Sequence, residues 1–337
     1  MLFFESRDEL CLALEKKREI DQNVRILYMG CPEFSVPPLR RILDEGWQIV
    51  GILTQPDRPV GRKQKICAPP LKEFALSRSL PVYQWENLRD QEVLEKFKSL
   101  KADLFITSAY GQILPASILE LPRLGAINIH PSALPRFRGA SPVASAILAG
   151  DKETAVCIMK MEEALDSGAI FAQLRVPLKG DETEEALLAE LGEDAADLLA
   201  QLLPDLVKGN VCPQDQGEEG VSYAPKFTRE DGRLDFSKTA KEVDQRVRAC
   251  SPWPGSFAFL DGKKYKFLET TWHEEDLGLV PGTVRVQDAR FLIACAKGCL
   301  EVIKVQLPSG KKCTSAQCAH NFKEGDCFSP NIESEEV

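Results

Sequence analysis

Short apolar runs alternate with amphipathic stretches through roughly the first two thirds of the chain. The runs with the length and composition of buried strands are 24–30, 49–54, 102–111, 125–130 and 154–161. Helical spacing is found between them at 34–44, 71–79 and 90–100, and the longest amphipathic stretch follows at 184–209. Because strands and helices alternate, the pattern predicts a Rossmann-like α/β domain with a mostly parallel sheet covered on both faces.

The pattern changes after about residue 210. The stretch 214–220 is polar and rich in glycine, as linkers are, and one more helix is predicted at 237–250. Short apolar runs between turn residues follow, and they predict a small antiparallel OB-like β-barrel. We therefore expect an N-terminal extension (1–23), a catalytic domain (24–210), a linker (211–230), a second domain (231–325) and a disordered tail (326–337).

The first predicted strand ends in Gly30, as the first strand of a dinucleotide-binding sheet does. The chain continues CPEFSVPPL, without a second or third glycine, and the next strand does not end in an acidic residue. The fingerprint that holds a pyrophosphate is therefore absent, which argues against a nicotinamide dehydrogenase. Open parallel sheets still bind ligands beyond the carboxyl ends of their strands, so a site is expected there.

Composition indicates a soluble protein. Hydrophobic residues make up 44% and charged residues 28% of the chain, and no stretch approaches the ~18 apolar residues of a membrane helix. The first 23 residues contain several acids and no apolar core, unlike a signal or transit peptide. The 11 cysteines form no CxxC pair, which favours idle thiols in a reducing compartment and no metal site. We expect a cytoplasmic monomer.

The net charge of −9 is unevenly distributed along the chain. Residues 211–322 contain 16 lysines and arginines against 15 aspartates and glutamates, so the remainder carries a net charge of −10. Phosphate binding depends on local basic clusters rather than on the total charge. The acidic total therefore does not exclude a nucleic-acid partner.

Three polar residues are the strongest candidates for chemistry. Asn128 and His130 stand two residues apart at the end of a predicted strand, so they share a face, and His130 is the only histidine before residue 273. Asp166 follows the next predicted strand in a Leu-Asp-Ser-Gly turn. A structural histidine and a solvated loop carboxylate are the plain alternatives for each alone. Together they are more specific, because neighbouring loops of a parallel sheet converge at one edge.

The segments NIHPSALP (128–135) and LDSG (165–168) resemble the folate-dependent formyltransferase family, whose members carry Asn-x-His-x-Ser-x-x-Pro and a later Leu-Asp-x-Gly turn. TQPDRPVGR, AYGQILP, RFRGASP, PWP and GKKCTSAQ extend the resemblance over about 24–322. It implies that Asn128, His130 and Asp166 are catalytic and that tetrahydrofolate contacts the run Ser132, Ala133, Leu134 and Pro135. Ala133 stands where the family usually has Leu, and Ala164 where it often has Gly.

The expected reaction passes through a tetrahedral centre with a negative oxygen, formed when an amine attacks the formyl group of 10-formyltetrahydrofolate. Asn128 and His130 would donate hydrogen bonds to that oxygen. Asp166 would orient His130 and assist proton transfer. No metal is required.

The acceptor is predicted from a basic loop that follows the second strand. Its candidate contact residues are the cations Arg58, Arg62, Lys63 and Lys65, with Lys72 beyond them, and its prolines predict irregular structure. By resemblance such a loop reaches the acceptor stem of methionyl-tRNA, with initiator tRNA as the substrate. The alternatives are a formyltransferase for an amino-sugar nucleotide or glycinamide ribonucleotide, a formyl-tetrahydrofolate hydrolase, and an RNA-binding protein with a decayed catalytic domain.

Overall fold

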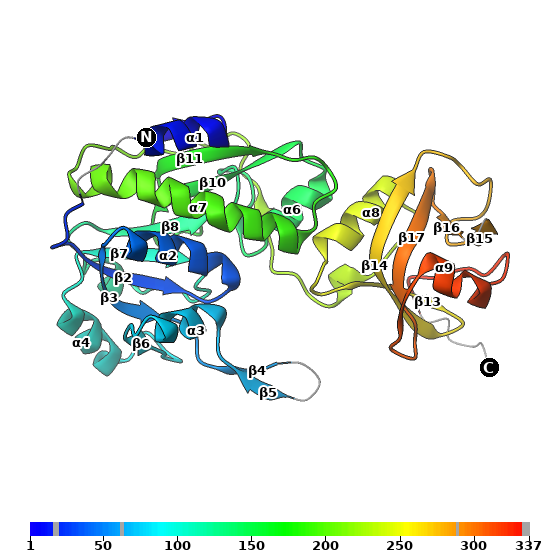
Figure 1. The fold of residues 1–337 in the computed structure, drawn as a ribbon, viewed down its shortest axis with the longest axis horizontal. Helices are drawn as coiled ribbons and strands as arrows, with labels where there is room; N and C mark the ends of the chain where they lie inside the picture. Colours follow the sequence, from blue (N-terminus) through cyan, green and yellow to red (C-terminus); the bar gives the residue numbers. More distant parts are fainter. Residues whose placement is uncertain (16–19, 61–63, 288–289, 332–337) are drawn as a thin grey trace. The chain divides into compact units, whose positions relative to one another are not determined.

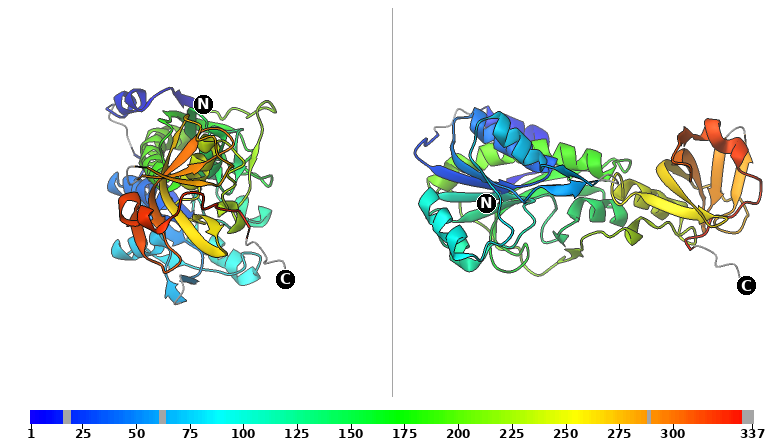
Figure 2. Two further views of the ribbon diagram at one scale, coloured as in Figure 1. Left: turned by 90° about the vertical axis from the view of Figure 1, so that its right-hand side faces the viewer. Right: turned by 90° about the horizontal axis from the view of Figure 1, so that it is seen from below.

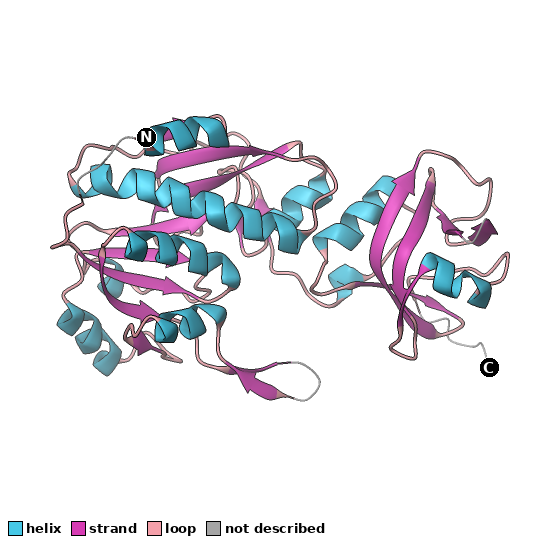
Figure 3. Cartoon of the chain, viewed as in Figure 1, coloured by secondary structure: helices cyan, strands magenta, loops and turns pink. Residues whose placement is uncertain are grey.

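The computed structural model describes residues 1–15, 20–60, 64–287 and 290–331. The chain divides into two compact units, each described here by itself. The first comprises residues 1–142, 153–177 and 187–225, and the second comprises 143–152, 178–186 and 226–337. Helices and strands alternate in the first unit, whereas strands dominate the second (Figure 3).

The first unit is built on an eight-stranded sheet with the order β1-β11-β10-β8-β7-β2-β3-β6. The strands are β1 (Leu2–Phe4), β2 (Arg25–Gly30), β3 (Gln48–Leu53), β6 (Val82–Tyr83), β7 (Leu104–Ser108), β8 (Ala126–His130), β10 (Glu153–Lys160) and β11 (Ile170–Pro177). β6, β3, β2, β7 and β8 run parallel to one another, while β10 is antiparallel to both β8 and β11. The predicted Rossmann-like, mostly parallel sheet is confirmed.

Helices cover both faces of this sheet (Figures 1 and 2). They include η1 (Glu33–Ser35), α2 (Val36–Asp44), α3 (Pro70–Ser77), α4 (Gln91–Leu100), α5 (Ala116–Leu119) and α7 (Glu184–Val207), whereas α6 (Pro142–Ala149) belongs largely to the second unit. α2 and α7 are joined by ion pairs from Arg40 and Arg41 to Glu193 and Asp197. Side chains of α4 and α5 pack with alternate residues of β2, β7 and β8, including Ala126. Asn128 and His130 share the face of Ala126, because side chains alternate along a strand.

The N-terminal segment is part of the first unit. β1 adds a parallel strand to the edge of β11, and α1 (Arg7–Leu14) follows it. Arg7 makes a bidentate pair with Asp194 of α7, at 2.8 Å for both contacts. Of the apolar positions in this segment, Leu2 and Phe3 therefore belong to a strand and Leu10 to a helix.

The second unit contains an antiparallel sheet in the order β13-β14-β17-β16-β15, with β18 paired to β17. Its strands are β13 (Ser256–Leu260), β14 (Lys263–His273), β15 (Val284–Gln287), β16 (Arg290–Ala294), β17 (Cys299–Gln306) and β18 (Lys312–Thr314). Its helices are η2 (Glu230–Gly232), α8 (Ala240–Ala249), α9 (Ser315–Cys318) and η3 (Ala319–Asn321). This antiparallel second domain was predicted and is confirmed.

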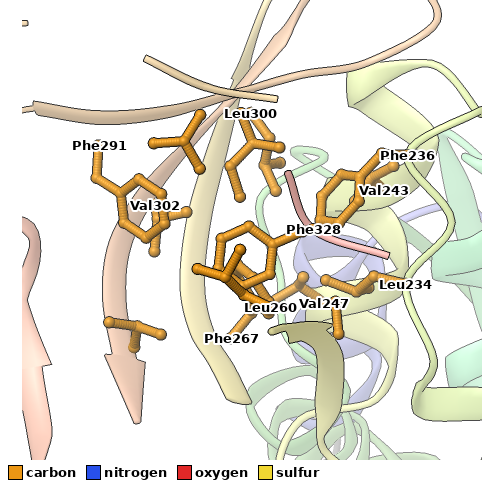
Figure 4. Packing of buried hydrophobic residues seen from close by; sticks show 14 of the residues in the cluster. Leu234, Phe236, Val243, Val247, Leu260, Phe267, Phe291, Leu300, Val302 and Phe328 are labelled. Atoms are coloured by element: carbon orange, nitrogen blue, oxygen red, sulfur yellow. The ribbon is translucent and has the colours of Figure 1, made fainter. Parts of the chain in front are cut away.

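Residues 326–329, expected to be disordered, are packed between the two edges of this sheet. Ser329 exchanges two backbone hydrogen bonds with Phe259 of β13, and Val284 of β15 donates to Asp326. Phe328 is 2% exposed and lies among the aromatic rings of the core (Figure 4). Its burial accounts for the order of this segment. Residues 332–337 of the expected tail lie outside the described residues.

Candidate active site

Asn128 lies on β8 with its amide held by the neighbouring strand. Thr107 of β7 is its partner in the parallel register, and the Thr107 hydroxyl donates to Asn128 Oδ1 at 2.7 Å. In this arrangement the hydroxyl donates and the amide oxygen of Asn128 accepts, because a carbonyl oxygen can only accept. No acceptor for the Asn128 NH2 group is found among the described residues. Its N–H groups are therefore available to a ligand.

His130 ends β8 and is almost fully buried, with a side chain 5% exposed. Its Nε2 lies 3.0 Å from the carbonyl oxygen of Phe137, which can only accept, so Nε2 carries a proton. Its Nδ1 lies 3.7 Å from Asp166 Oδ2. Both ring nitrogens therefore face oxygen atoms.

Asp166 occupies a turn whose backbone is tightly constrained. Its φ of +46° is in the left-handed region, which aspartate tolerates better than most residues. Gly168 passes so close to the sheet that an added Cβ would lie 1.9 Å from the carbonyl oxygen of Lys160. The turn therefore requires glycine at position 168 to bring Asp166 to its place.

The carboxylate of Asp166 is anchored at one oxygen. Oδ2 accepts a 2.8 Å hydrogen bond from the backbone N–H of Gly139, while Oδ1 accepts none from the residues that the structure describes. Gly139 has a φ of +122°, and an added Cβ would lie 2.6 Å from the carbonyl oxygen of Ala224. A side chain there would push apart the backbone that holds Asp166.

The sequence predicted that Asn128, His130 and Asp166 lie together because loops of a parallel sheet converge at one edge. That reason is incomplete, because one of the strands is antiparallel. β10 runs antiparallel to β8, with Met159 beside Asn128 and Cys157 beside His130. The turn after β10 therefore begins near the start of β8, not at its carboxyl end. It reaches His130 because the segment 161–169 folds back toward the end of β8.

The wall beside these polar groups is apolar. Ala155, Cys157 and Met159 of β10 pack with Leu134 and Ile170. Burial raises the pKa of the Cys157 thiol to about 12, so the thiol stays neutral. The side chains of β10 that form this wall therefore carry no charge beside His130.

The predicted folate-contacting run follows β8 directly. Ser132 is fully buried and donates through Oγ to the carbonyl oxygen of Arg136 at 2.8 Å, so its hydroxyl is used within the loop. Leu134 is buried in the apolar wall, and the Leu134–Pro135 peptide bond is cis. Ala133 and Pro135 are half-buried. Ala133 and Pro135 are therefore the residues of this run that are partly accessible.

Sequence reasoning missed three residues that support the site: Thr107, Gly139 and Gln216. Gln216 lies in the stretch interpreted as a linker, yet its amide donates to the carbonyl oxygens of Asp166 and Gly168, both at 2.8 Å. Its neighbours along the chain are also held within the first unit, because β12 (Tyr223–Ala224) pairs with β9 (Arg138–Gly139). A threonine inside a buried apolar strand was the signal available for Thr107. Gln216 gave no such signal, because the polar composition of its segment is also typical of a linker.

The basic loop contains a hairpin, formed by β4 (Arg58–Val60) and β5 (Lys65–Cys67), so the expectation of irregular structure is wrong for these residues. Arg58 is paired with Glu86 at 2.8 Å. Lys65 is exposed, and Lys72 is held by Asp57. Arg62 and Lys63 lie outside the described residues.

Across the described part of the chain, no three histidine, cysteine, aspartate or glutamate side chains are grouped so that they could hold a metal ion. No described helix is both long enough and apolar enough to span a membrane.

Two family matches cover the two parts of the chain. Residues 22–203 match the family described as Formyl transferase, and residues 226–323 match Formyl transferase, C-terminal domain. With the α/β unit that carries Asn128, His130 and Asp166, they define the class of the protein as a two-domain formyl transferase.

Full-length relatives narrow this class. The chain is 40% identical over 297 residues to the methionyl-tRNA formyltransferase of Dehalococcoides mccartyi, covering 87% of this chain and 94% of the relative. It is 40% identical over 301 residues to that of Listeria monocytogenes, covering 89% and 95%. The chain belongs to the methionyl-tRNA formyltransferase family.

Solved structures with lower sequence identity to this chain share its fold. An N-formyltransferase from Helicobacter canadensis, in complex with folinic acid and dTDP-3-aminofucose, superposes with a TM-score of 0.62 at 20% identity, over 83% of this chain and 98% of that one. HypX from Aquifex aeolicus, in complex with tetrahydrofolic acid, gives 0.61 at 17% identity, over 90% and 50%. Both comparisons concern the fold alone.

Proposed function

We propose that this formyl transferase moves the formyl group of 10-formyltetrahydrofolate to the α-amino group of methionyl-tRNA, with Asn128, His130 and Asp166 as the catalytic residues. The observation that carries the proposal is the convergence of these side chains. Asp166 lies 3.7 Å from His130, beside an Asn128 whose N–H donors are unused by the described residues.

Asn128 supplies the first donor to the reacting oxygen. When the amine attacks the formyl carbon, the carbonyl oxygen gains negative charge, and donors already in place stabilise it. The hydrogen bond from Thr107 leaves the Asn128 NH2 group facing away from β7. Loss of one such donor costs about 100- to 1000-fold in rate in comparable enzymes.

His130 supplies the second donor through Nδ1. Its Nε2 is already bound to the carbonyl oxygen of Phe137, so Nδ1 is the nitrogen left for the reacting group. We assign the donated proton to Nδ1, which lies 3.7 Å from Asp166 Oδ2. The ring is held in place by Phe137 on one side and attracted by Asp166 on the other.

Asp166 moves the proton. A free α-amino group titrates near about 8, so an attacking amine must lose a proton, and N10 of the folate must gain one as the C–N bond breaks. Oδ2 is anchored by Gly139, which leaves Oδ1 to accept and return a proton, directly or through a water molecule.

The donor site lies along the loop that follows β8. Ala133 and Pro135 are partly accessible and can contact the folate. Ser132 and Leu134 stabilise the loop, Ser132 by its hydrogen bond to Arg136 and Leu134 by its burial. The Ala133 side chain is smaller than the leucine usual in the family, which leaves more room for the folate. Solved relatives of the fold in complex with folinic acid and tetrahydrofolic acid support a folate donor.

The acceptor is proposed from the relatives and from two basic regions, the β4–β5 hairpin and the β13–β14 strand pair that carries Lys264. The relatives at 40% identity are named methionyl-tRNA formyltransferases. Lys65 is exposed on the β4–β5 hairpin, and Arg58 is exposed beside it although paired with Glu86. Arg62 and Lys63, between the two strands, complete the proposed contact. Such contacts are to phosphates and are weakened by salt.

An amino-sugar nucleotide is the second candidate acceptor, because the Helicobacter canadensis structure holds one in a similar fold. Its identity to this chain is 20%, against 40% for the methionyl-tRNA formyltransferases.

One assay separates the acceptors. The protein is incubated with 10-formyltetrahydrofolate and offered methionyl-tRNA, an amino-sugar nucleotide or water alone. Rapid formylation of methionyl-tRNA, initiator above elongator, is expected. Formylation of the sugar or hydrolysis of the donor, with methionyl-tRNA unchanged, would contradict the proposal.

A further inference from the structure

We propose that Gln216 is a positioning residue for formyl transfer, because its side chain fixes the turn that presents Asp166. This inference rests on the proposed function of Asp166. Gln216 lies outside the Formyl transferase match at 22–203 and the C-terminal match at 226–323, in the segment between them.

The Gln216 amide is bound at both ends. Nε2 donates to the carbonyl oxygens of Asp166 and Gly168, both at 2.8 Å. Oε1 accepts from Nε and Nη2 of Arg138, at 3.0 and 2.7 Å. Arginine can only donate and a carbonyl oxygen can only accept, so these partners determine the orientation of the amide.

The turn needs this support because its own geometry is unfavourable. Asp166 adopts left-handed backbone, with a φ of +46°, a region that residues other than glycine disfavour. Leu165 beside it is 60% exposed, so little apolar burial stabilises the tip of the turn. Two hydrogen bonds to the carbonyl oxygens on either side of Ser167 compensate for this.

Arg138 connects the support to the carboxylate. Arg138 and Gly139 are consecutive in β9, and the Gly139 N–H holds Asp166 Oδ2 at 2.8 Å. The side chain of Asp166 is thus tied to β9 directly, and its main chain is tied to β9 through Gln216. A shift of the turn changes the 3.7 Å separation of Asp166 from His130. Misplacement by about 1 Å can cost about 100-fold in rate.

The test compares Gln216→Ala and Gln216→Glu with the parent and with Gln214→Ala. Gln216→Glu keeps an acceptor for Arg138 but replaces the two N–H donors by an oxygen that faces carbonyl oxygens. Gln214 is a matched control, because its side chain is exposed and its backbone bonds to Ile170, at 2.8 and 2.9 Å, survive the substitution.

Two quantities are measured: kcat and KM for formyl transfer, and the exchange rate of the Gly139 backbone amide. Both Gln216 variants are expected to lose about tenfold or more in kcat with KM for the folate within about twofold. Their Gly139 amide is expected to exchange faster, because its acceptor moves. Gln214→Ala should match the parent in both measurements.

The amide exchange separates this inference from the proposed function. If the parent transfers no formyl group, the proposed function fails, and the Gly139 exchange still decides whether Gln216 holds the turn. Unchanged exchange in both Gln216 variants, or a kcat within about twofold of an active parent, overturns the positioning role.

Discussion

At the scale of single residues, each proposed catalytic group is held by a neighbouring residue. Thr107 orients the amide of Asn128, the Phe137 carbonyl fixes the ring of His130, and Gly139 anchors Asp166. Groups held in place before the substrate arrives stabilise developing charge without reorganising. The supporting residues are therefore expected to affect the rate more than binding.

Thr107 gives the cleanest test of this view. Thr107→Val keeps the shape of the side chain but removes the hydroxyl that donates to Asn128 Oδ1 at 2.7 Å. The Asn128 amide is then free to rotate, so kcat should fall about tenfold to 100-fold with little change in KM. Steady-state kinetics measure both. Thr107→Ser, which retains the hydroxyl, should keep most of the activity, and equal losses in the two variants would contradict the orienting role.

Sequence reasoning reached the residues proposed to be catalytic but not those that hold them. Asn128 and His130 are visible because their spacing places two polar groups on one strand face. Thr107 lies 21 positions from Asn128, and only the parallel register of β7 and β8 brings them together. Gln216 is 50 positions from Asp166 in a polar stretch whose composition also suits a linker.

At the scale of elements, the strands and helices with strong apolar periodicity were predictable. The predicted helix at 184–209 corresponds to α7 (Glu184–Val207), and the run at 125–130 to β8. Strand direction was not predictable in the same way, because periodicity carries no information about partners. β11 and the β4–β5 hairpin were missed, the latter because its prolines suggested irregular backbone.

The segment after β18 is the clearest case of tertiary packing overriding composition. Residues 323–331 are mostly polar, yet Phe328 lies 5.5 Å from Phe267 and 5.4 Å from Tyr265, measured between ring centroids. One buried aromatic ring gains enough from burial to order a short polar segment.

Phe328→Ala should therefore destabilise the second unit. Deleting a buried phenylalanine side chain costs about 3–5 kcal/mol, from lost burial and the cavity that remains. Urea unfolding monitored by the fluorescence of Trp253 and Trp272, both in this unit, would measure the loss. Cys327→Ala changes the exposed neighbour and serves as the control. Equal unfolding midpoints for both variants would show that the segment contributes nothing to the core.

At the scale of the whole molecule, a chain with a net charge of −9 is proposed to bind a polyanion. Local clusters of cations can bind phosphates although the whole chain is negatively charged. On β13 and β14, Lys264 lies 3.2 Å above the ring of Phe257, and Arg233 lies 5.6 Å from the same ring. Burial, followed by the nearby cation of Lys266, lowers the pKa of Lys264. The lysines of β14, Lys263, Lys264 and Lys266, therefore supply the positive charge of this strand pair, since Arg233 is paired with Glu230.

Lys264→Gln should raise the KM for methionyl-tRNA about threefold to tenfold and leave the KM for the folate unchanged. The slope of log(kcat/KM) against log salt concentration should become shallower by about one, as for the loss of one phosphate contact. Lys323→Gln, an exposed lysine of the same unit, is the control. An unchanged salt slope in Lys264→Gln would remove this strand pair from the proposed tRNA contact.

The central claim is that Asn128, His130 and Asp166 together perform formyl transfer. Single-turnover formylation of methionyl-tRNA by Asn128→Ala, His130→Ala and Asp166→Ala, at saturating 10-formyltetrahydrofolate, tests it most directly. Each variant is expected to lose about 100-fold or more in rate while unfolding at a similar urea concentration to the parent. Rates within about threefold of the parent in all three variants would contradict the assignment.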